Sequence, residues 1–205
     1  TPNGNSTPAK SQGTKVTVIA TSPATVSSRQ YVWSTSTTAP TSGWTTFTNG
    51  ATLTQPSGNG NYYLHIKATD NAGNTVTTRS NAFVLDNTAP VITIGDYSTA
   101  WTNKDITVTA TVNKGSLNAT SHTFTANGSF TFTATDTAGN TASKTVTINN
   151  IDKTNPTLTL TPSITTPTNK DVVITAKASD SGSGIKEVEL PDGKKVTTAE
   201  TNYTV

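Results

Sequence analysis

Apolar and polar residues alternate along much of this chain, in short runs separated by turn-forming residues. The clearest runs are ITVTATV at 106–112, FTFTAT at 130–135 and TVTIN at 145–149. A period of two residues is typical of a β-strand with one face buried and the other in water. In the first run, the residues expected to face a core are Ile106, Val108, Ala110 and Val112. No stretch has the period of an amphipathic helix, so we predict an all-β fold of short strands.

Three phrases recur along the chain at one interval. ATDNAGNT at 68–75 returns as ATDTAGNT at 134–141, DNTAP at 86–90 as DKTNP at 152–156, and TNKDITVTA at 102–110 as TNKDVVITA at 168–176. The shared spacing of 66 residues is too long for a solenoid repeat and suits a small domain. We therefore predict three tandem domains, called here repeats 1, 2 and 3, at residues 1–86, 87–152 and 153–205.

The phrase ATDxAGN is interpreted as a hairpin turn, because an alternating run precedes it each time. Glycine supplies the left-handed backbone position of the loop, and the aspartate side chain accepts hydrogen bonds from the amides of the loop. The predicted turn residues are Asp70, Gly73 and Asn74 in the first copy and Asp136, Gly139 and Asn140 in the second. The alternative is a cation site that uses the same aspartates.

These hairpins, with the DxTxP phrases and the strands that begin with TNKD, resemble the bacterial immunoglobulin-like repeats of large cell-surface proteins. The pattern Tyr62-x-Leu64-x-Ile66-x-Ala68 is also similar to the fibronectin type III strand that carries the tyrosine corner. The resemblance implies tandem immunoglobulin-like β-sandwich domains in an extracellular location, on the cell surface or secreted. It does not specify a function, because such modules serve as stalks, spacers, adhesins and enzyme accessories.

The DxTxP phrases lie at the predicted domain boundaries, and we call residues 86–90 linker 1 and residues 152–156 linker 2. Proline restricts the backbone of each linker and removes an amide donor where the next strand begins. Short, stiff linkers favour an extended rod over a collapsed cluster.

Repeat 1 has an aromatic insertion, YVWSTSTTAPTSGWTTFTNG at 31–50. Trp33 is expected in the core, where immunoglobulin-like domains bury a tryptophan. Trp44, with Tyr31 and Phe47, is the candidate for a binding site, because exposed aromatic rings stack on sugars. Trp101, which precedes TNKD, is expected to cover the end of a sandwich near a linker.

Repeat 3 stops short of the pattern set by repeat 2. Residues 203–205 align with 122–124, and no phenylalanine strand or third AGN hairpin follows. The third domain is therefore expected to be incomplete, without its last two strands. The residues expected to face an open groove are Val172, Ile174, Ala176, Val188 and Leu190. Two explanations remain open: the chain is a fragment of a longer protein, or a neighbouring chain supplies the strands by self-association.

Composition narrows the function classes. Threonine, a β-branched residue that suits exposed strand faces, makes up roughly a quarter of the chain. The chain has no cysteine, so no disulfide stabilises it, and a net charge of +2 gives no argument for nucleic acid. No stretch is apolar enough to suggest membrane contact.

No catalytic constellation is evident, so we do not expect an enzyme. His65 and His122 are expected to face solvent, since their strand faces otherwise carry threonine or lysine. We expect no cofactor. Calcium at the domain junctions is an open alternative, and the aspartates available to it are Asp70, Asp86, Asp136, Asp152 and Asp180.

The sequence therefore favours a structural spacer or fibre-forming segment of an extracellular bacterial surface protein. The alternative is a module that binds polysaccharide or another surface ligand through the aromatic insertion of repeat 1.

Overall fold

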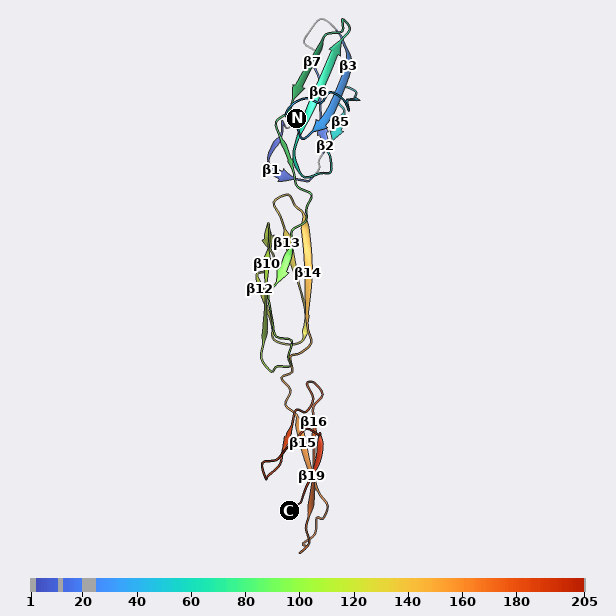
Figure 1. Cartoon of the computed structure of the whole chain (residues 1–205). Coiled ribbons are helices and arrows are strands. Elements are labelled where there is room, and N and C mark those ends of the chain that lie inside the picture. Colours follow the sequence, from blue (N-terminus) through green and yellow to red (C-terminus); the bar gives the residue numbers. More distant parts are fainter. Residues whose placement is uncertain (1–2, 11–12, 20–24, 205) are drawn as a thin grey trace. The chain divides into compact units, whose positions relative to one another are not determined.

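The computed structural model describes residues 3–10, 13–19 and 25–204. Every regular element of these residues is a β-strand (Figure 1). The predicted all-β fold is therefore confirmed.

Contacts divide the chain into two compact units. The first comprises Thr1–Thr93, Thr111–Ala119 and Phe132–Lys144, and the second comprises Ile94–Ala110, Thr120–Thr131 and Thr145–Val205. Strands β10 (Ile106–Val112), β13 (Gly128–Thr135) and β14 (Thr141–Ile148) contribute residues to both.

The main sheet of repeat 1 is built around β6 (Gly60–Asp70), which pairs antiparallel with β3 (Val26–Ser34) along nearly its whole length (Figure 1). The sheet order is β1-β8-β6-β3-β4, and β7 also pairs with β6. The remaining strands of this sheet are β1 (Asn5–Ala9), β4 (Thr45–Thr46), β7 (Thr75–Arg79) and β8 (Phe83–Leu85). A second small sheet pairs β2 (Gly13–Lys15) with β5 (Thr52–Thr54).

The core of repeat 1 gathers the apolar positions that alternate along these strands. Its buried members are Phe47, Leu53, Leu64 and Phe83, and Val16, Val18, Tyr31, Trp33, Ala51 and Ile66 pack against them. Trp33 contacts Phe83 edge to face, with ring centroids 5.3 Å apart. Trp33 thus belongs to the core region, although it is only partly buried.

His65 was predicted to face solvent, but it is buried. Its side chain is 1% exposed. The segment that follows β3 returns over this face of β6, and the Nε2 atom of His65 lies 3.1 Å from the carbonyl oxygen of Ser36.

Repeat 2 contains two three-stranded sheets, visible as β10, β12, β13 and β14 in Figure 1. One has the order β12-β10-β9, with β9 at Ile92–Ile94 and β12 at Ser121–Phe124. The other has the order β11-β13-β14, with β11 at Ser116–Leu117. Along β10 buried and exposed residues alternate from Ile106 to Thr111, which confirms the predicted strand faces.

His122 is a second correction. It is half-buried, on the same strand face as the buried Phe124. Its ring stacks on Phe130, with centroids 3.9 Å apart and planes 10° from parallel. It therefore extends the core of repeat 2 and does not face open solvent.

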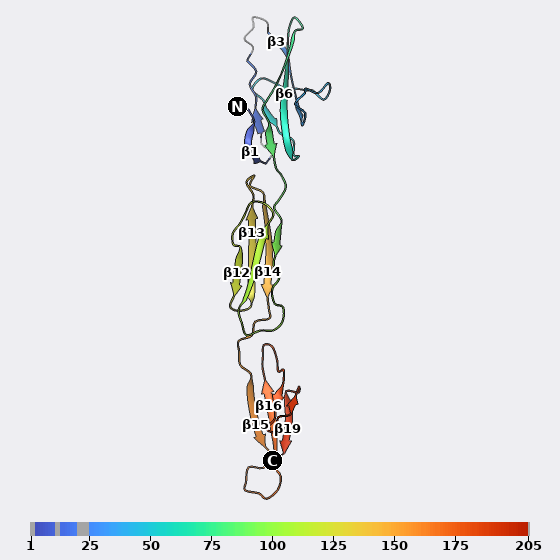
Figure 2. The same cartoon turned by 60° about the vertical axis from the view of Figure 1, so that its left-hand side comes forward.

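Repeat 3 has one three-stranded sheet, β15-β16-β19, and one hairpin, β17-β18 (Figure 2). The strands are β15 (Thr157–Pro162), β16 (Val173–Ser179), β17 (Val188–Glu189), β18 (Lys195–Val196) and β19 (Glu200–Thr204). Ile174 pairs with Tyr203 as Val108 pairs with His122, so Tyr203 corresponds to His122 as the sequence alignment predicts. No strand between 153 and 204 corresponds to β13 or β14.

The predicted open groove of repeat 3 is only partly correct. Ala176, Val188 and Leu190 are 6%, 7% and 9% exposed, so they are buried within the repeat. The β17-β18 hairpin begins at Val188, and its contribution to a core was not foreseen. The exposed apolar side chains are instead Leu158 and Leu160 of β15, at 58% and 62%.

Candidate functional site

The two AGN hairpins have the same turn geometry. In the first, the Oδ1 atom of Asp70 accepts hydrogen bonds from the amides of Ala72 and Asn74, at 2.9 and 2.8 Å. The Asn74 side chain donates to Oδ2 at 3.0 Å. Gly73 has a φ of 88°, a left-handed conformation that costs other residues free energy.

The second hairpin repeats these contacts with equal distances. Asp136 Oδ1 accepts from the amides of Ala138 and Asn140 at 2.9 and 2.8 Å, and the Asn140 side chain donates to Oδ2 at 3.0 Å. Gly139 has a φ of 80°. The repeated phrase is thus a repeated turn.

The second hairpin, unlike the first, is also bound to linker 1. Asn140 contacts the linker directly, and Asp136 contacts it through Lys114. The Nζ atom of Lys114 lies 2.7 Å from Asp86 Oδ2 and 2.9 Å from Asp136 Oδ2, and it donates to the carbonyl oxygen of Thr88 at 2.6 Å. Asn140 donates to the carbonyl oxygen of Asp86 at 2.9 Å. Linker 1 is therefore bound by two side chains of repeat 2.

The ammonium group of Lys114 stabilises two carboxylates. Burial raises the pKa of Asp136, whose side chain is 2% exposed, but the hydrogen bonds from Lys114 and Asn140 outweigh burial and hold that pKa far below its ordinary value. The hydrogen bond from Lys114, followed by the Thr88 amide, lowers the pKa of Asp86. The hydrogen bond to Asp86 in turn raises the pKa of Lys114.

Linker 1 is also bound to repeat 1. The amide of Asp86 donates to the carbonyl oxygen of Ala9 at 3.0 Å, which continues the pairing of β1 with β8. The amide of Asn87 donates to Asn59 Oδ1 at 2.7 Å, and its side chain donates to the carbonyl oxygen of Gly58 at 2.8 Å. Linker 1 therefore has hydrogen-bond partners on both of its flanks.

Linker 2 is bound to repeat 2 mainly through the backbone. The amide of Asp152 donates to the carbonyl oxygen of Thr102 at 2.9 Å, and the amide of Thr102 donates to the carbonyl oxygen of Asn150 at 3.0 Å. Lys153 pairs with Asp105 at 2.6 Å, and both side chains are nearly half exposed.

On its other flank, linker 2 meets the loop 180–184 of repeat 3. Asp152 Oδ2 accepts from the amide of Ser183 at 2.7 Å, and Oδ1 accepts from the amide of Thr154 at 3.0 Å. The amide of Ser183 is the main cause of the lowered pKa of Asp152. A Cβ atom on Gly182 would clash with the carboxylate of Asp152, so this close approach requires glycine.

Asp180 shapes that loop as the aspartates shape the AGN turns. Its Oδ1 atom accepts from the amides of Gly182 and Gly184 at 3.0 and 2.9 Å. The intervals of two and four residues are those of Asp70 and Asp136.

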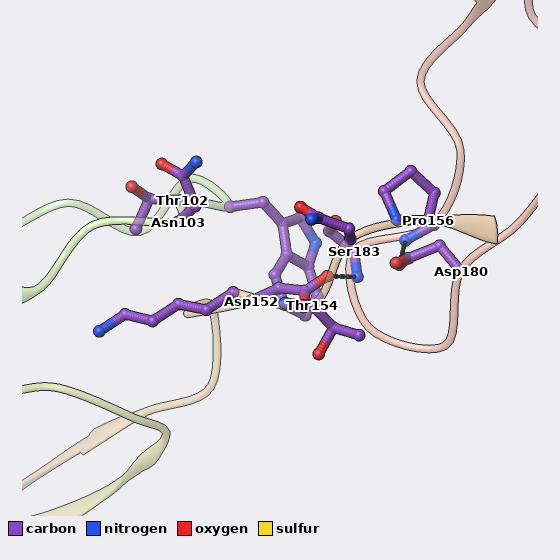
Figure 3. A pocket seen from close by; sticks show the side chains of 11 residues that line it. Thr102, Asn103, Asp152, Thr154, Pro156, Asp180 and Ser183 are labelled. Atoms are coloured by element: carbon purple, nitrogen blue, oxygen red, sulfur yellow. Dashed lines mark hydrogen bonds between the residues drawn. The ribbon is translucent and has the colours of Figure 1, made fainter.

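A cavity of about 280 Å³ opens beside linker 2, and we call it the linker 2 cavity (Figure 3). The residues that line it include Trp101, Thr102, Asp152, Lys153, Asp180 and Ser183. Trp101 is 53% exposed, so part of its ring surface remains accessible. Figure 3 shows the hydrogen bond from Ser183 to Asp152, which holds the repeat 3 side of the cavity against the linker.

The predicted binding residues of repeat 1 do not form an exposed platform. Phe47 is 8% exposed, and Tyr31 packs against it edge to face at 5.9 Å, so both rings belong to the core region. Trp44 lies in the predicted loop but is half-buried; its Nε1 atom donates to the carbonyl oxygen of Pro40, and Lys67 Nζ lies 4.7 Å from its ring centroid. Of the three candidate binding residues, Phe47 and Tyr31 therefore lie in the core region rather than on an exposed surface.

The junction aspartates lie at the predicted turns and linkers. Between Asp86 and Asp136, the ammonium group of Lys114 occupies the position expected for a cation. The described part of the chain holds no group of three or more histidine, cysteine, aspartate or glutamate side chains suited to a metal ion. Calcium at the junctions stays a prediction from the sequence.

Sequence reasoning missed Lys114 and the cavity beside Trp101. A signal for the first was present, because Lys114 precedes Asp180 by the same 66 residues that separate the repeated phrases. Repeat 2 has Lys114 beside Asp86 of linker 1, whereas repeat 3 has Asp180 at the corresponding position beside Asp152 of linker 2. The two linkers are therefore bound in different ways.

The sheets, the left-handed turns and the linkers define a chain of immunoglobulin-like β-sandwich domains. Residues 10–87 match the family model of a bacterial Ig-like domain, so the chain includes such a domain in repeat 1. A comparison with curated proteins finds no match for the chain. Across the described ranges, there is no helix of the length and hydropathy needed to cross a membrane.

Proposed function

We propose that this chain is a structural spacer, or fibre-forming segment, of an extracellular bacterial surface protein. The supporting observation is that both linkers are hydrogen-bonded to the repeats on their two sides. Asp86 binds Ala9 in repeat 1 and Lys114 in repeat 2, and Asp152 binds Thr102 in repeat 2 and Ser183 in repeat 3. Linkers bound in this way restrict the angles between neighbouring domains, which is what a spacer requires.

The exterior of the strands agrees with this role. Exposed threonines pair across neighbouring strands, as Thr107 does with Thr123 at 2.9 Å and Thr131 with Thr145 at 2.8 Å. Such pairs stabilise a sheet without charge. In this role the segment is non-catalytic, and its residues serve to hold neighbouring domains in place.

Small-angle X-ray scattering of the whole chain tests the proposal. A spacer gives an elongated profile that does not change with protein concentration. A profile typical of a compact globule would contradict the spacer.

A matched pair of variants connects the scattering profile to the linkers. Lys114→Met removes the ammonium group that binds Asp86 in linker 1, so its profile should show a broader distribution of interdomain distances. Lys144→Met, at an exposed position of β14, removes the same charge elsewhere and should scatter like the parent. If the two variants scatter alike, the bond to linker 1 does not restrict the angle between its domains.

The extracellular location needs its own experiment. Antibodies raised against the chain should label intact cells of the source bacterium or bind protein from its culture medium. Labelling that requires permeabilised cells would contradict an extracellular role.

A further inference from the structure

The two linkers present related acceptors to different partners. Asp152 and Thr154 in linker 2 are the counterparts of Asp86 and Thr88 in linker 1, which together hold the ammonium group of Lys114. At the position of that lysine, repeat 3 has Asp180. Linker 2 thus retains the acceptors and replaces their cation with a second carboxylate.

No lysine of the described chain replaces the missing cation at linker 2. Lys153, the linker's own lysine, pairs with Asp105 at 2.6 Å. Among the described residues, no ion pair joins Asp152 or Asp180 to a lysine or arginine. Lys153 also lines the cavity, but its ammonium group is paired with Asp105, so Asp152 and Asp180 are left there without a paired cation.

The cavity adds an aromatic surface to this charge. Trp101 is 53% exposed and lines the same space as Asp152 and Asp180. A cation near an indole ring is attracted by the ring electrons, and an alkyl chain packs on its face. Repeat 1 contains one such pair, because Lys67 Nζ lies 4.7 Å from the centroid of Trp44.

The size of the cavity also limits which ligands it can bind. Its volume of about 280 Å³ accommodates a butylammonium group. An anionic group would meet two carboxylates, and a neutral sugar would leave them without a counter-charge. A divalent metal ion such as calcium requires about six to eight oxygen ligands, and the described residues hold no group of three or more side chains suited to one.

We propose that the linker 2 cavity binds a primary ammonium group on an alkyl chain, as in a lysine side chain of a partner polypeptide. Asp152 and Asp180 accept its hydrogen bonds, and Trp101 covers its alkyl chain. The interaction reproduces between two molecules what Lys114 does within linker 1. This assignment is independent of the spacer role, which requires no ligand.

Titration followed by NMR tests the proposal on the whole chain. The probe is Nα-acetyl-lysine amide, and the matched control is Nα-acetyl-norleucine amide, which keeps the alkyl chain and lacks the ammonium. We expect the lysine probe to shift the indole N–H signal of Trp101 and the amide signal of Ser183 in a saturable way, with a dissociation constant on the order of 1 mM. Equal shifts with norleucine, or none with lysine, would overturn the proposal.

Two variants locate the binding group. Asp180→Asn keeps an oxygen that can accept the amides of Gly182 and Gly184, so the loop is retained while the charge is removed. It should weaken lysine binding by roughly fivefold, which corresponds to about 1 kcal/mol. Asp192→Asn, in the exposed turn of the β17-β18 hairpin, is the matched control and should leave binding unchanged. Equal weakening by both variants would assign binding to the overall charge of repeat 3 and would contradict a site in the cavity.

The aromatic contribution is tested by Trp101→Ala against Trp44→Ala. The first, followed through the amide signal of Ser183, should abolish saturable binding. The second removes a ring that already contacts Lys67 and should not affect it. Calcium chloride serves as a competing probe. If calcium shifts the same signals and the lysine probe does not, the cavity is a metal site and the proposal is wrong.

Discussion

Linkers 1 and 2 share a sequence pattern and are bound in different ways. Linker 1 depends on side chains: Lys114 joins Asp86 to the second AGN hairpin at 2.7 and 2.9 Å. Linker 2 depends on backbone amides: Ser183 donates to Asp152 at 2.7 Å, and the absence of a side chain at Gly182 makes room for this contact. The shared DxTxP phrase therefore places a hydrogen-bond acceptor at each predicted boundary between repeats, and the loop of the following repeat supplies the donor.

The difference has a physical consequence. A buried ion pair loses its benefit when one partner is removed, because the remaining charge stays desolvated. An amide-to-carboxylate bond depends on the backbone of its donor, so side-chain changes at the donor leave it in place. Linker 1 should therefore be much more sensitive to substitution than linker 2.

The largest expected effect is that of Lys114→Met. The substitution retains the alkyl chain and leaves the carboxylate of Asp136, 2% exposed, without its counter-charge. We expect a clear fall in the melting temperature of repeat 2 and faster amide exchange at residues 86–90 and 136–140, measured by hydrogen exchange with mass spectrometry. Lys144→Met is again the control and should behave like the parent. Protection that is unchanged at residues 136–140 would show that Lys114 does not hold the hairpin.

The aspartates of the two hairpins allow the contribution of Lys114 to be tested with one kind of substitution. Asp70 and Asp136 make identical turn contacts, but only Asp136 also binds Lys114. Asp70→Ala should lower the melting temperature of repeat 1 only slightly, because an exposed turn loses hydrogen bonds that water replaces in part. Asp136→Ala should destabilise repeat 2 more, because it also leaves Lys114 with one carboxylate instead of two. Equal losses in thermal melts of the two variants would mean that linker binding adds nothing to the turn.

The acid dependence of stability distinguishes ion pairing from packing. The folded-state pKa of Asp136 lies below its ordinary value of 3.8, so its contribution is present above 3.8 and is lost as pH falls through the folded value. In Lys114→Met, burial without the lysine should raise that pKa, so the variant binds its proton at a higher pH than the parent does. The stability difference between parent and variant should therefore narrow as the pH falls from the variant's pKa to the parent's. Thermal melts from about pH 2 to pH 7 measure it, and a constant difference would assign the effect of Lys114 to packing.

Lys114 also predicts behaviour in base. Its folded-state pKa lies above the ordinary 10.5, so its contribution is complete below 10.5 and is lost as pH rises through the folded value. The same melts, extended to alkaline pH, should show the parent approaching Lys114→Met. Curves that stay equally far apart would again point to packing of the alkyl chain.

Short-range patterns account for what the sequence predicted well. The alternation in 106–112 requires only that one strand face be buried, and the AGN turns require only a left-handed glycine beside an aspartate. Contacts between distant segments account for the errors. His65 lies among threonine and lysine in its strand, but Ser36, on a segment 29 residues earlier, covers it. Phe47 was a candidate binding residue of the aromatic insertion, because nothing local shows that the insertion returns to the core.

The candidate site was predictable only in part, for the same reason. The linker aspartates were singled out from their turns, whereas their partners Lys114 and Ser183 lie 28 and 31 residues away along the chain. A pairing of the repeats position by position reveals the exchange of Lys114 for Asp180. It does not reveal the cavity beside Trp101, which arises from packing between separate segments.

The smallest expected effect is that of Lys153→Met in linker 2. This variant tests whether linker 2, unlike linker 1, is bound without dependence on a side-chain ion pair. The pair with Asp105 is short, 2.6 Å, but the two side chains are 46% and 47% exposed. Exposed pairs contribute between about 0 and 1 kcal/mol, because water screens the charges and both side chains lose freedom. The backbone bonds from Asp152 to Thr102 and from Ser183 to Asp152 remain in the variant. Its melting curve should therefore overlie that of the parent, in low salt and in high salt. A loss as large as that of Lys114→Met would show that linker 2 also depends on a side-chain ion pair, and the distinction between the two linkers would not hold.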